Sequence, residues 1–278
     1  MKTHRWPNRS DPHSEASVVN PFASRTVAVR YAFARPNLHR HVTPILRKRI
    51  SPQPHRAMDL GCGTGLSTIA LRGFANIVVG VDASEDMLAA RTDHYAPYVL
   101  AAAERLPFRA RSFDLVTVAS AIHWFDREAL PEVARVLLEG GWLVVYDVWL
   151  RTEMADVPQF GEWARGDGLS HYRPVAKYQY DDVVLAHAGF DRAWEAELQR
   201  EVEMSRDALV EYLMTHSERI AAVREGREAE SEQRRLLADG IAPFYGDAPT
   251  RSVAFGIQID AFRRQAIASS TSGTREPF

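Results

Sequence analysis

The chain has 278 residues, of which 46% are hydrophobic and 25% charged, and its formal net charge is −2. This composition is globular and excludes a collagen-like, low-complexity or wholly disordered chain. There is no apolar run near the roughly 18 residues that cross a bilayer, no secretory signal at the start, and one cysteine, Cys62, which excludes an internal disulfide. We therefore expect a cytoplasmic protein with one large domain, or one domain and a cap.

The small net charge hides an uneven distribution. Residues 1–56 carry 11 lysines and arginines against two acids, Asp11 and Glu15, which gives +9. The rest of the chain holds 23 of the 34 basic residues and 34 of the 36 acidic ones, which gives −11. A basic segment of this kind can bind nucleic acid, bind an anionic ligand or form a solvated helix face.

The chain begins and ends in polar segments. Residues 1–20 and 268–278 are expected to be flexible tails. Residues 21–56, which follow the first tail, are predicted to form a basic helical lid. Its helices cover 22–35, which ends ahead of a proline, and 38–50.

From residue 57 onward the pattern changes to short apolar strands that alternate with helices. The predicted strands are 57–60, 77–81, 98–100, 113–118 and 142–148. The predicted helices are 66–71, a helix capped by Ser84, and 127–138. This alternation is typical of a parallel sheet covered on both faces.

The C-terminal half has a different period. Residues 194–204 and 253–261 alternate apolar and polar side chains, which predicts two half-exposed strands that end the sheet as an antiparallel pair. Residues 205–240 between them are polar, helical in pattern and too long for a connector. We expect residues 205–250 to form a helical cap.

A glycine cluster follows the first predicted strand. Residues 59–65 read Asp-Leu-Gly-Cys-Gly-Thr-Gly at a strand-to-helix turn. Glycines there permit positive φ and close approach of a ligand, and the helix behind them offers unpaired N–H groups. The Gly-Lys-Ser/Thr of a phosphate loop is absent, and Leu66 and Thr68 stand where a dinucleotide fingerprint requires its last glycine.

Two carboxylates flank this turn. Asp59 precedes the first glycine by two residues, where it would repel pyrophosphate and suit a cationic amino group. Asp82 ends the second predicted strand 21 residues after Gly61, the place where a carboxylate holds ribose hydroxyls in nucleoside sites. The implied ligand has a ribose and a cation but no phosphate, a description that S-adenosylmethionine fits.

Five motifs, in order and correctly spaced, resemble those of the class I S-adenosylmethionine-dependent methyltransferases, and in particular the type-11 methyltransferase domain. They are residues 59–65, 81–84, 104–108, 113–116 and 138–141. The resemblance covers roughly residues 57–150. Residues 31–36 and 121–125 are also similar to features of the trans-aconitate methyltransferase-like group, which methylates small molecules including carboxylic acids.

The resemblance implies a Rossmann-like α/β fold. Its mostly parallel, helix-flanked sheet has seven strands in the order 3-2-1-4-5-7-6, with the last strand antiparallel. Residues 57–150 would form the S-adenosylmethionine-binding core, and residues 151–267 the rest of the sheet with the helical substrate cap. The N-terminal helices and the 205–250 insert would cover the open end.

The resemblance also assigns a cofactor site. Asp59 would lie under the methionine amino group, Asp82 would hold the ribose, and Met87 would flank the adenine. The family often has Asp where this chain has Ala102, so adenine N6 would rely on nearby backbone or on a water. The implied cofactor-binding residues are Asp59, Gly61, Cys62, Gly63, Gly65, Asp82, Ala83, Met87, Ala103, Glu104, Ala119 and Ser120. Cys62 itself is expected to be a small turn residue.

Acceptor binding and catalysis are assigned to fewer residues. His123 follows the fourth predicted strand, at the sheet edge where ligands react, and is the candidate general base; the alternative is that it packs against the cofactor. The remaining histidines lack metal-ligand spacing, so no metal is expected. The candidate acceptor-binding residues are Tyr31, Arg35, Trp124 and Tyr172.

The sequence thus predicts methyl transfer to an oxygen nucleophile, a carboxylate or a hydroxyl, of a small molecule by in-line attack. With Arg35 and Arg40 the basic lid would form a positive ceiling, which favours an anionic acceptor. We expect no nucleic-acid or membrane partner, and the oligomeric state is left open. One alternative is a phenol or quinone acceptor held by Trp163 and the tyrosines, Tyr172, Tyr178 and Tyr180. Another is a regulatory module that binds S-adenosylmethionine without catalysis, whereas a dinucleotide oxidoreductase is disfavoured by the missing fingerprint.

Overall fold

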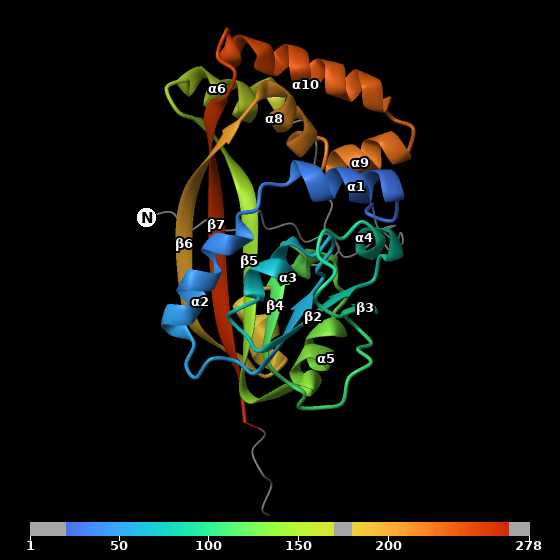
Figure 1. Cartoon of the computed structure of the whole chain (residues 1–278), viewed down its shortest axis with the longest axis vertical. Helices are drawn as coiled ribbons and strands as arrows, with labels where there is room; N and C mark the ends of the chain where they lie inside the picture. Colours follow the sequence, from blue (N-terminus) through green and yellow to red (C-terminus); the bar gives the residue numbers. More distant parts are fainter. Residues whose placement is uncertain (1–20, 170–179, 267–278) are drawn as a thin grey trace, which may run out of the picture.

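The computed structural model describes residues 21–169 and 180–266 (Figure 1). The two predicted tails, 1–20 and 268–278, and the candidate Tyr172 lie outside the described residues. Within the described ranges, no helix is both long and apolar enough to cross a membrane.

A seven-stranded sheet with the order β3-β2-β1-β4-β5-β7-β6 forms the centre of the described structure. The strands are β1 (Arg56–Leu60), β2 (Ile77–Asp82), β3 (Tyr98–Leu100), β4 (Phe113–Ala119), β5 (Leu137–Met154), β6 (Phe190–Met204) and β7 (Arg251–Arg264). Strands β1 to β5 are parallel to one another, and β7 is antiparallel to both β5 and β6. The predicted strand order and the antiparallel last strand are confirmed.

Helices flank the sheet and cover its upper end in Figure 1. The α-helices are α1 (Arg25–Ala34), α2 (Thr43–Arg49), α3 (Leu66–Leu71), α4 (Glu85–Ala89), α5 (Ala129–Val136), α6 (Pro158–Trp163), α7 (Asp182–His187), α8 (Arg206–Leu213), α9 (Ser217–Arg224) and α10 (Glu230–Tyr245). Two short 3₁₀ helices and a π-helical turn complete them, η1 (His39–His41), η2 (Ile122–Trp124) and η3 (Ala164–Gly168). The predicted helix 38–50 is therefore divided, because α2 restarts with Pro44 in its first turn, where a missing N–H costs nothing.

The last strand differs from the sequence prediction. We expected residues 253–261 to be half-exposed, but β7 lies between β5 and β6 and is buried along most of its length. The glycine of β7 is covered as well, because a Cβ on Gly256 would lie 2.3 Å from the indole of Trp149. The half-exposed pattern belongs to β6 alone, because β6 is the edge strand. Pairing with β7 also carries β5 past the predicted end, to Met154.

Polar contacts fasten the N-terminal helix to the C-terminal cap. In Figure 1, α6, α8, α9 and α10 gather at one end of the sheet with α1 beneath them. Arg30 on α1 forms ion pairs with Glu211 on α8, at 3.5 Å, and with Glu230 on α10. Arg35, which follows α1, donates from Nε to Thr215 Oγ1 at 2.8 Å. Segments far apart in the sequence therefore close the same end of the sheet.

The buried position of β7 leads to a stability prediction. Phe255 is fully buried, and its ring centroid lies 5.2 Å from that of Tyr212 in the cap. Phe255→Ala should lower the free energy of unfolding by about 3–5 kcal/mol, because it removes buried apolar surface and leaves a cavity. Phe33→Ala is the matched control, since Phe33 is 83% exposed, and its effect should stay within about 0.5 kcal/mol. Urea denaturation measures both, and equal losses would contradict the assigned burial.

Candidate functional site

The glycine turn connects β1 to α3 and takes a backbone path that favours glycine. Gly61, Gly63 and Gly65 have φ values of +71°, +54° and +85°, where an L side chain is strained. A Cβ on Gly61 would also lie 2.5 Å from the Cβ of Ala121, in the segment after β4. The turn therefore presents bare backbone at the carboxyl edge of the sheet.

Asp59 anchors this turn from beneath. Its carboxylate is fully buried and accepts hydrogen bonds from Ser67 Oγ at 2.6 Å, Thr68 Oγ1 at 2.7 Å and Thr117 Oγ1 at 3.0 Å. Burial raises the pKa of Asp59 to about 6, because the loss of solvation outweighs the three hydroxyl donors. Asp59 thus ties β1 to α3 and to β4, and no pattern in the sequence indicates these hydroxyl partners.

Asp82 closes the turn from the neighbouring strand. Its two carboxylate oxygens accept from the backbone N–H of Gly63 at 2.7 Å and of Ser84 at 2.8 Å. The Ser84 hydroxyl in turn accepts from the N–H of Met87 at 3.3 Å, so the predicted N-cap of α4 is confirmed. Burial raises the pKa of Asp82, while the backbone N–H donors oppose that shift. The carboxylate thus joins the two loops that lead out of β1 and β2.

A cavity of about 400 Å³ opens above these loops. It collects most of the residues that the sequence singled out: Tyr31, Gly61, Cys62, Gly63, Asp82, Ala83, Met87, Ala102, Ala103, Glu104, Ala119, Ser120 and Trp124 all line it. Four other candidates do not line it, namely Asp59, Gly65, Arg35 and His123. The cavity thus lies at the carboxyl ends of β1, β2 and β4, where open α/β sheets bind ligands.

Comparison with known proteins agrees with this geometry. Residues 58–145 match the family described as a methyltransferase domain. The chain is 33% identical over 168 residues to a demethylmenaquinone methyltransferase of Corynebacterium glutamicum. This match covers 57% of the chain and 70% of the relative. The chain belongs to the class I S-adenosylmethionine-dependent methyltransferases. The narrower resemblance to the trans-aconitate methyltransferase-like group stays a prediction.

Two longer matches extend the similarity over most of the chain. The chain is 25% identical over 240 residues to a methyltransferase of Dictyostelium discoideum. This match covers 84% of the chain and 91% of the relative. The chain also superimposes on the solved structure of a type II methyltransferase from Anaeromyxobacter dehalogenans with a TM-score of 0.65. That match has 24% identity and covers 84% of this chain and 99% of the other. The fold therefore extends beyond residues 58–145 to the strands and helices of the C-terminal half.

The cavity of the methyltransferase fits S-adenosylmethionine. Thr64 lines the cavity, and its buried hydroxyl has no hydrogen-bond partner among the described residues. A buried hydroxyl without a partner is costly, so a polar ligand group in the cavity would satisfy it. Cys62 also lines the cavity, and burial raises the pKa of its thiol, which agrees with a small, unreactive turn residue.

Ser120 bears backbone strain at the end of β4. Its φ is +50°, a value uncommon for a residue other than glycine. Its N–H donates to the carbonyl of Tyr146 at 2.8 Å, and its Oγ accepts from the N–H of Val148 at 3.1 Å. These bonds to β5 hold the strained residue in place. Such strain is concentrated at functional sites, and Ser120 lines the cavity.

His123 and Arg35 lie beside the cavity and not along its lining. His123 is half-buried on η2 with its ring 5.2 Å from that of Trp124, and burial lowers its pKa to about 4. The Arg35 guanidinium lies between two aromatic rings, 4.8 Å from the centroid of Tyr31 and 4.9 Å from that of Tyr212. The role of His123 as a general base stays a prediction.

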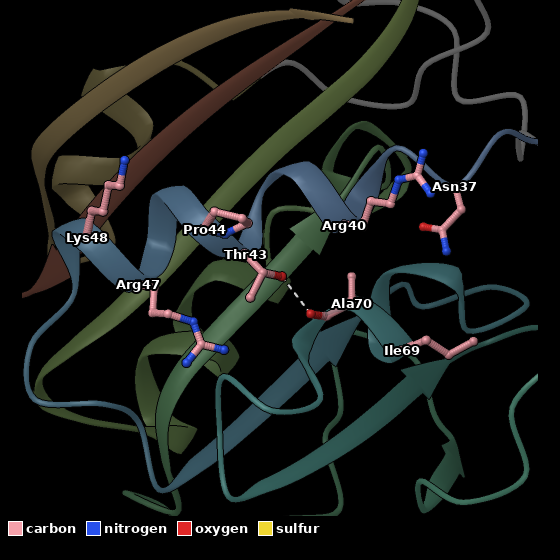
Figure 2. Close-up of a pocket in the computed structure, with 8 residues that line it drawn as sticks. All are labelled: Asn37, Arg40, Thr43, Pro44, Arg47, Lys48, Ile69 and Ala70. Atoms are coloured by element: carbon pink, nitrogen blue, oxygen red, sulfur yellow. Dashed lines mark hydrogen bonds between the residues drawn. The ribbon is translucent and has the colours of Figure 1, made fainter. Parts of the chain in front are cut away.

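The other predicted cation, Arg40, lines a separate surface hollow of about 550 Å³ between α2 and α3. Figure 2 shows Arg40, Arg47 and Lys48 spread along η1 and α2, without meeting at one point. The hydrogen bond drawn in this hollow joins Thr43 Oγ1 to the carbonyl of Ala70 at 2.6 Å. Arg40 therefore does not contribute a positive ceiling to the cavity.

Sequence reasoning missed one histidine. His39 lines the cavity, and its Nδ1 lies 3.0 Å from the hydroxyl of Tyr146 on β5. In the sequence it belongs to a basic His-Arg-His run, which has the appearance of a solvated helix face. Only the contact with Tyr146 on β5, far along the chain, distinguishes His39 from a solvent-facing histidine.

The shifted pKa of Asp59 predicts a pH dependence of stability. The pKa rises from the ordinary 3.8 to about 6 on folding. Between these values the folded protein holds a proton that the unfolded chain has released, so the free energy of unfolding falls as pH rises. Asp59→Asn removes this titration, and the fall from pH 4 to pH 7 should shrink by on the order of 2 kcal/mol. Urea denaturation at both pH values measures it.

The control for that experiment is Asp207→Asn, because the side chain of Asp207 is 84% exposed. Its free energy of unfolding should follow the wild-type pH dependence. An Asp59→Asn variant with the same dependence as wild type would contradict the assigned shift.

Proposed function

We propose that this methyltransferase transfers a methyl group from S-adenosylmethionine to a hydroxyl oxygen of a small aromatic acceptor of the phenol or quinol type. The observation that carries the proposal is the aromatic wall of the cavity. Phe22, Tyr31, Trp124 and Phe125 all line it. The Phe22 ring packs edge-on against Tyr31 at 5.8 Å and against Trp124 at 5.5 Å. Such walls favour flat, ring-shaped ligands.

One relative supports an aromatic acceptor, without bearing on which of its atoms is methylated. The Corynebacterium glutamicum relative is a demethylmenaquinone methyltransferase, which points to a quinone-type substrate for that enzyme. A carboxylate acceptor, the other expectation from the sequence, depended on positive charge from Arg35 and Arg40. Because neither side chain lines the cavity, the aromatic acceptor becomes the first candidate and the small carboxylic acid the alternative.

For the cofactor we propose the following placement. When bound, S-adenosylmethionine supplies a methyl group that its positive sulfonium already activates. Asp82 would accept the ribose hydroxyls, since each carboxylate oxygen keeps a further lone pair beside its backbone N–H. Gly61 and Gly63 would lie against the methionine part, and Met87 against the adenine. The buried Asp59 would act indirectly, by holding the turn that contacts the methionine part.

For the reaction itself, the chain's residues align the acceptor and exclude water. We propose that the strained Ser120 and the neighbouring Ala119, at the end of β4, fix the floor on which the acceptor lies. The aromatic wall then holds the ring of the acceptor so that its oxygen faces the methyl group. The acceptor oxygen would react as the phenolate, after its proton has passed to solvent water, so that the transfer leaves neutral S-adenosylhomocysteine. Alignment of this kind supplies much of the rate enhancement when the leaving group is already activated.

The placement of Asp82 can be tested by binding. Asp82→Ala should weaken the affinity for S-adenosylhomocysteine at least tenfold, because it removes both the ribose acceptor and the bonds that order Gly63 and Ser84. Titration calorimetry measures the Kd. Glu85→Ala is the control, since Glu85 is an exposed carboxylate outside the cavity lining, and it should bind as wild type does. Equal affinities of wild type and Asp82→Ala would rule out the ribose role.

The acceptor class can be tested by methyl transfer. The protein is incubated with methyl-labelled S-adenosylmethionine and two pools, one of hydroxylated naphthalenes and reduced naphthoquinones, the other of small aliphatic carboxylic acids. We expect label in the aromatic pool, with product mass spectra and NMR placing the methyl on oxygen. Asp82→Ala should transfer little label to either pool. Label confined to the carboxylic acids would establish the alternative acceptor instead.

A further inference from the structure

His39 lies between the cavity and the sheet. It belongs to the short helix η1, lines the cavity and is half-buried. Behind it, the side chain of Tyr146 on β5 is only 2% exposed and does not line the cavity. Their rings meet with centroids 5.7 Å apart and planes inclined by 67°, and His39 Nδ1 lies 3.0 Å from the Tyr146 hydroxyl.

The direction of this hydrogen bond follows from the needs of the buried phenol. Among the described residues, the Tyr146 hydroxyl bonds to His39 alone. Burial raises the pKa of Tyr146 well above its usual range, so the phenol keeps its proton. Burial and the nearby Arg35 lower the pKa of His39 to about 4, so its ring is neutral near pH 7. A buried O–H must find an acceptor, and among the described residues the only one within reach is Nδ1 of the neutral ring.

This bond fixes the tautomer of His39. If Nδ1 accepts from the phenol, the single ring proton of a neutral imidazole stands on Nε2. Nε2 lies across the ring from Tyr146 and makes no hydrogen bond to any residue that the structure describes. Since His39 lines the cavity and Tyr146 does not, the Nε2–H donor remains for a ligand. An uncharged donor suits an oxygen with lone pairs and offers nothing to an ammonium group.

We propose that His39 binds an oxygen of the methyl acceptor through its Nε2–H and that Tyr146 is a positioning residue that holds His39 in this tautomer. The inference rests on the proposed function, because it supplies the partner for the hydroxyl oxygen of the aromatic acceptor. His39 then acts as a hydrogen-bond donor and not as a general base.

The charged and titratable groups around the pair agree with this role. Arg35 faces His39 from the end of α1 and opposes protonation of its ring. Asp59 from β1 and Tyr31 from α1 oppose ionisation of Tyr146. Every one of these neighbours favours the neutral phenol and the neutral imidazole, so the donor keeps one form across the physiological pH range.

The first test reads the tautomer without any acceptor. Two-bond ¹H–¹⁵N NMR spectra of the protein saturated with S-adenosylhomocysteine are compared with those of His39→Gln to assign the His39 signals. We expect a protonated Nε2, an unprotonated Nδ1 and no titration between pH 5.5 and 8. Tyr146→Phe should abolish this fixed pattern, because Nδ1 loses its donor. A protonated Nδ1 in wild type would overturn the proposal, whatever the protein methylates.

The second test uses the aromatic acceptor of the transfer assay. His39→Ala should raise KM for the acceptor at least tenfold, with the Kd for S-adenosylhomocysteine within threefold of wild type. His39→Gln should recover most of that loss, since its amide nitrogen can reach the place of Nε2, whereas His39→Asn, whose nitrogen reaches only the place of Nδ1, should not. Tyr146→Phe should raise KM more than it lowers kcat.

The matched control is His41→Ala, because His41 is on the same short helix and does not line the cavity. Its KM should equal that of wild type. A wild-type KM for His39→Ala, or equal recovery by Asn and Gln, would overturn the proposal. If wild type binds S-adenosylhomocysteine but methylates no aromatic acceptor, the proposed function fails, and the NMR result still decides the tautomer.

Discussion

The structure depends on one buried carboxylate. Asp59 accepts three hydroxyl hydrogen bonds, two from α3 and one from β4, at the point where β1 gives way to the glycine turn. A buried acid is tolerated only when its oxygens are satisfied. Here that requirement fixes the start of α3 against two central strands. Asp59 therefore sets the backbone path of the glycine turn that borders the cavity, although Asp59 itself does not line that cavity.

The closed end of the sheet depends on a second set of polar contacts. Arg30 and Arg35 bind α1 to the cap through Glu211, Glu230 and Thr215. The positive charge of the N-terminal segment is therefore used partly to hold the lid and partly on the outer surface around α2. What faces the cavity from this segment is aromatic or neutral, as with Tyr31 and His39. The chemistry of the site follows from these side chains and not from net charge.

Much of the fold could be predicted from the chain. The apolar runs of β1, β2 and β4 match the predicted strands within one residue, since a strand covered on both faces needs a continuous apolar run. The glycine turn and Asp82 were found because their spacing reflects local backbone geometry. β7 was misjudged, because its alternating pattern resembles that of an edge strand. Only its place between β5 and β6, with Trp149 over Gly256, buries its second face.

The sequence by itself determined the glycine turn and the place of Asp82 beside it, because residues 59–65 and Asp82 are joined by short, local connections that a linear pattern records. The tertiary structure decided the rest. In it, the Arg35 guanidinium packs against the rings of Tyr31 and Tyr212, and His123 lies outside the cavity lining. The tertiary structure also paired His39 with Tyr146, 107 residues further along the chain. Such pairs form only when distant segments pack together, and no spacing in the sequence encodes them.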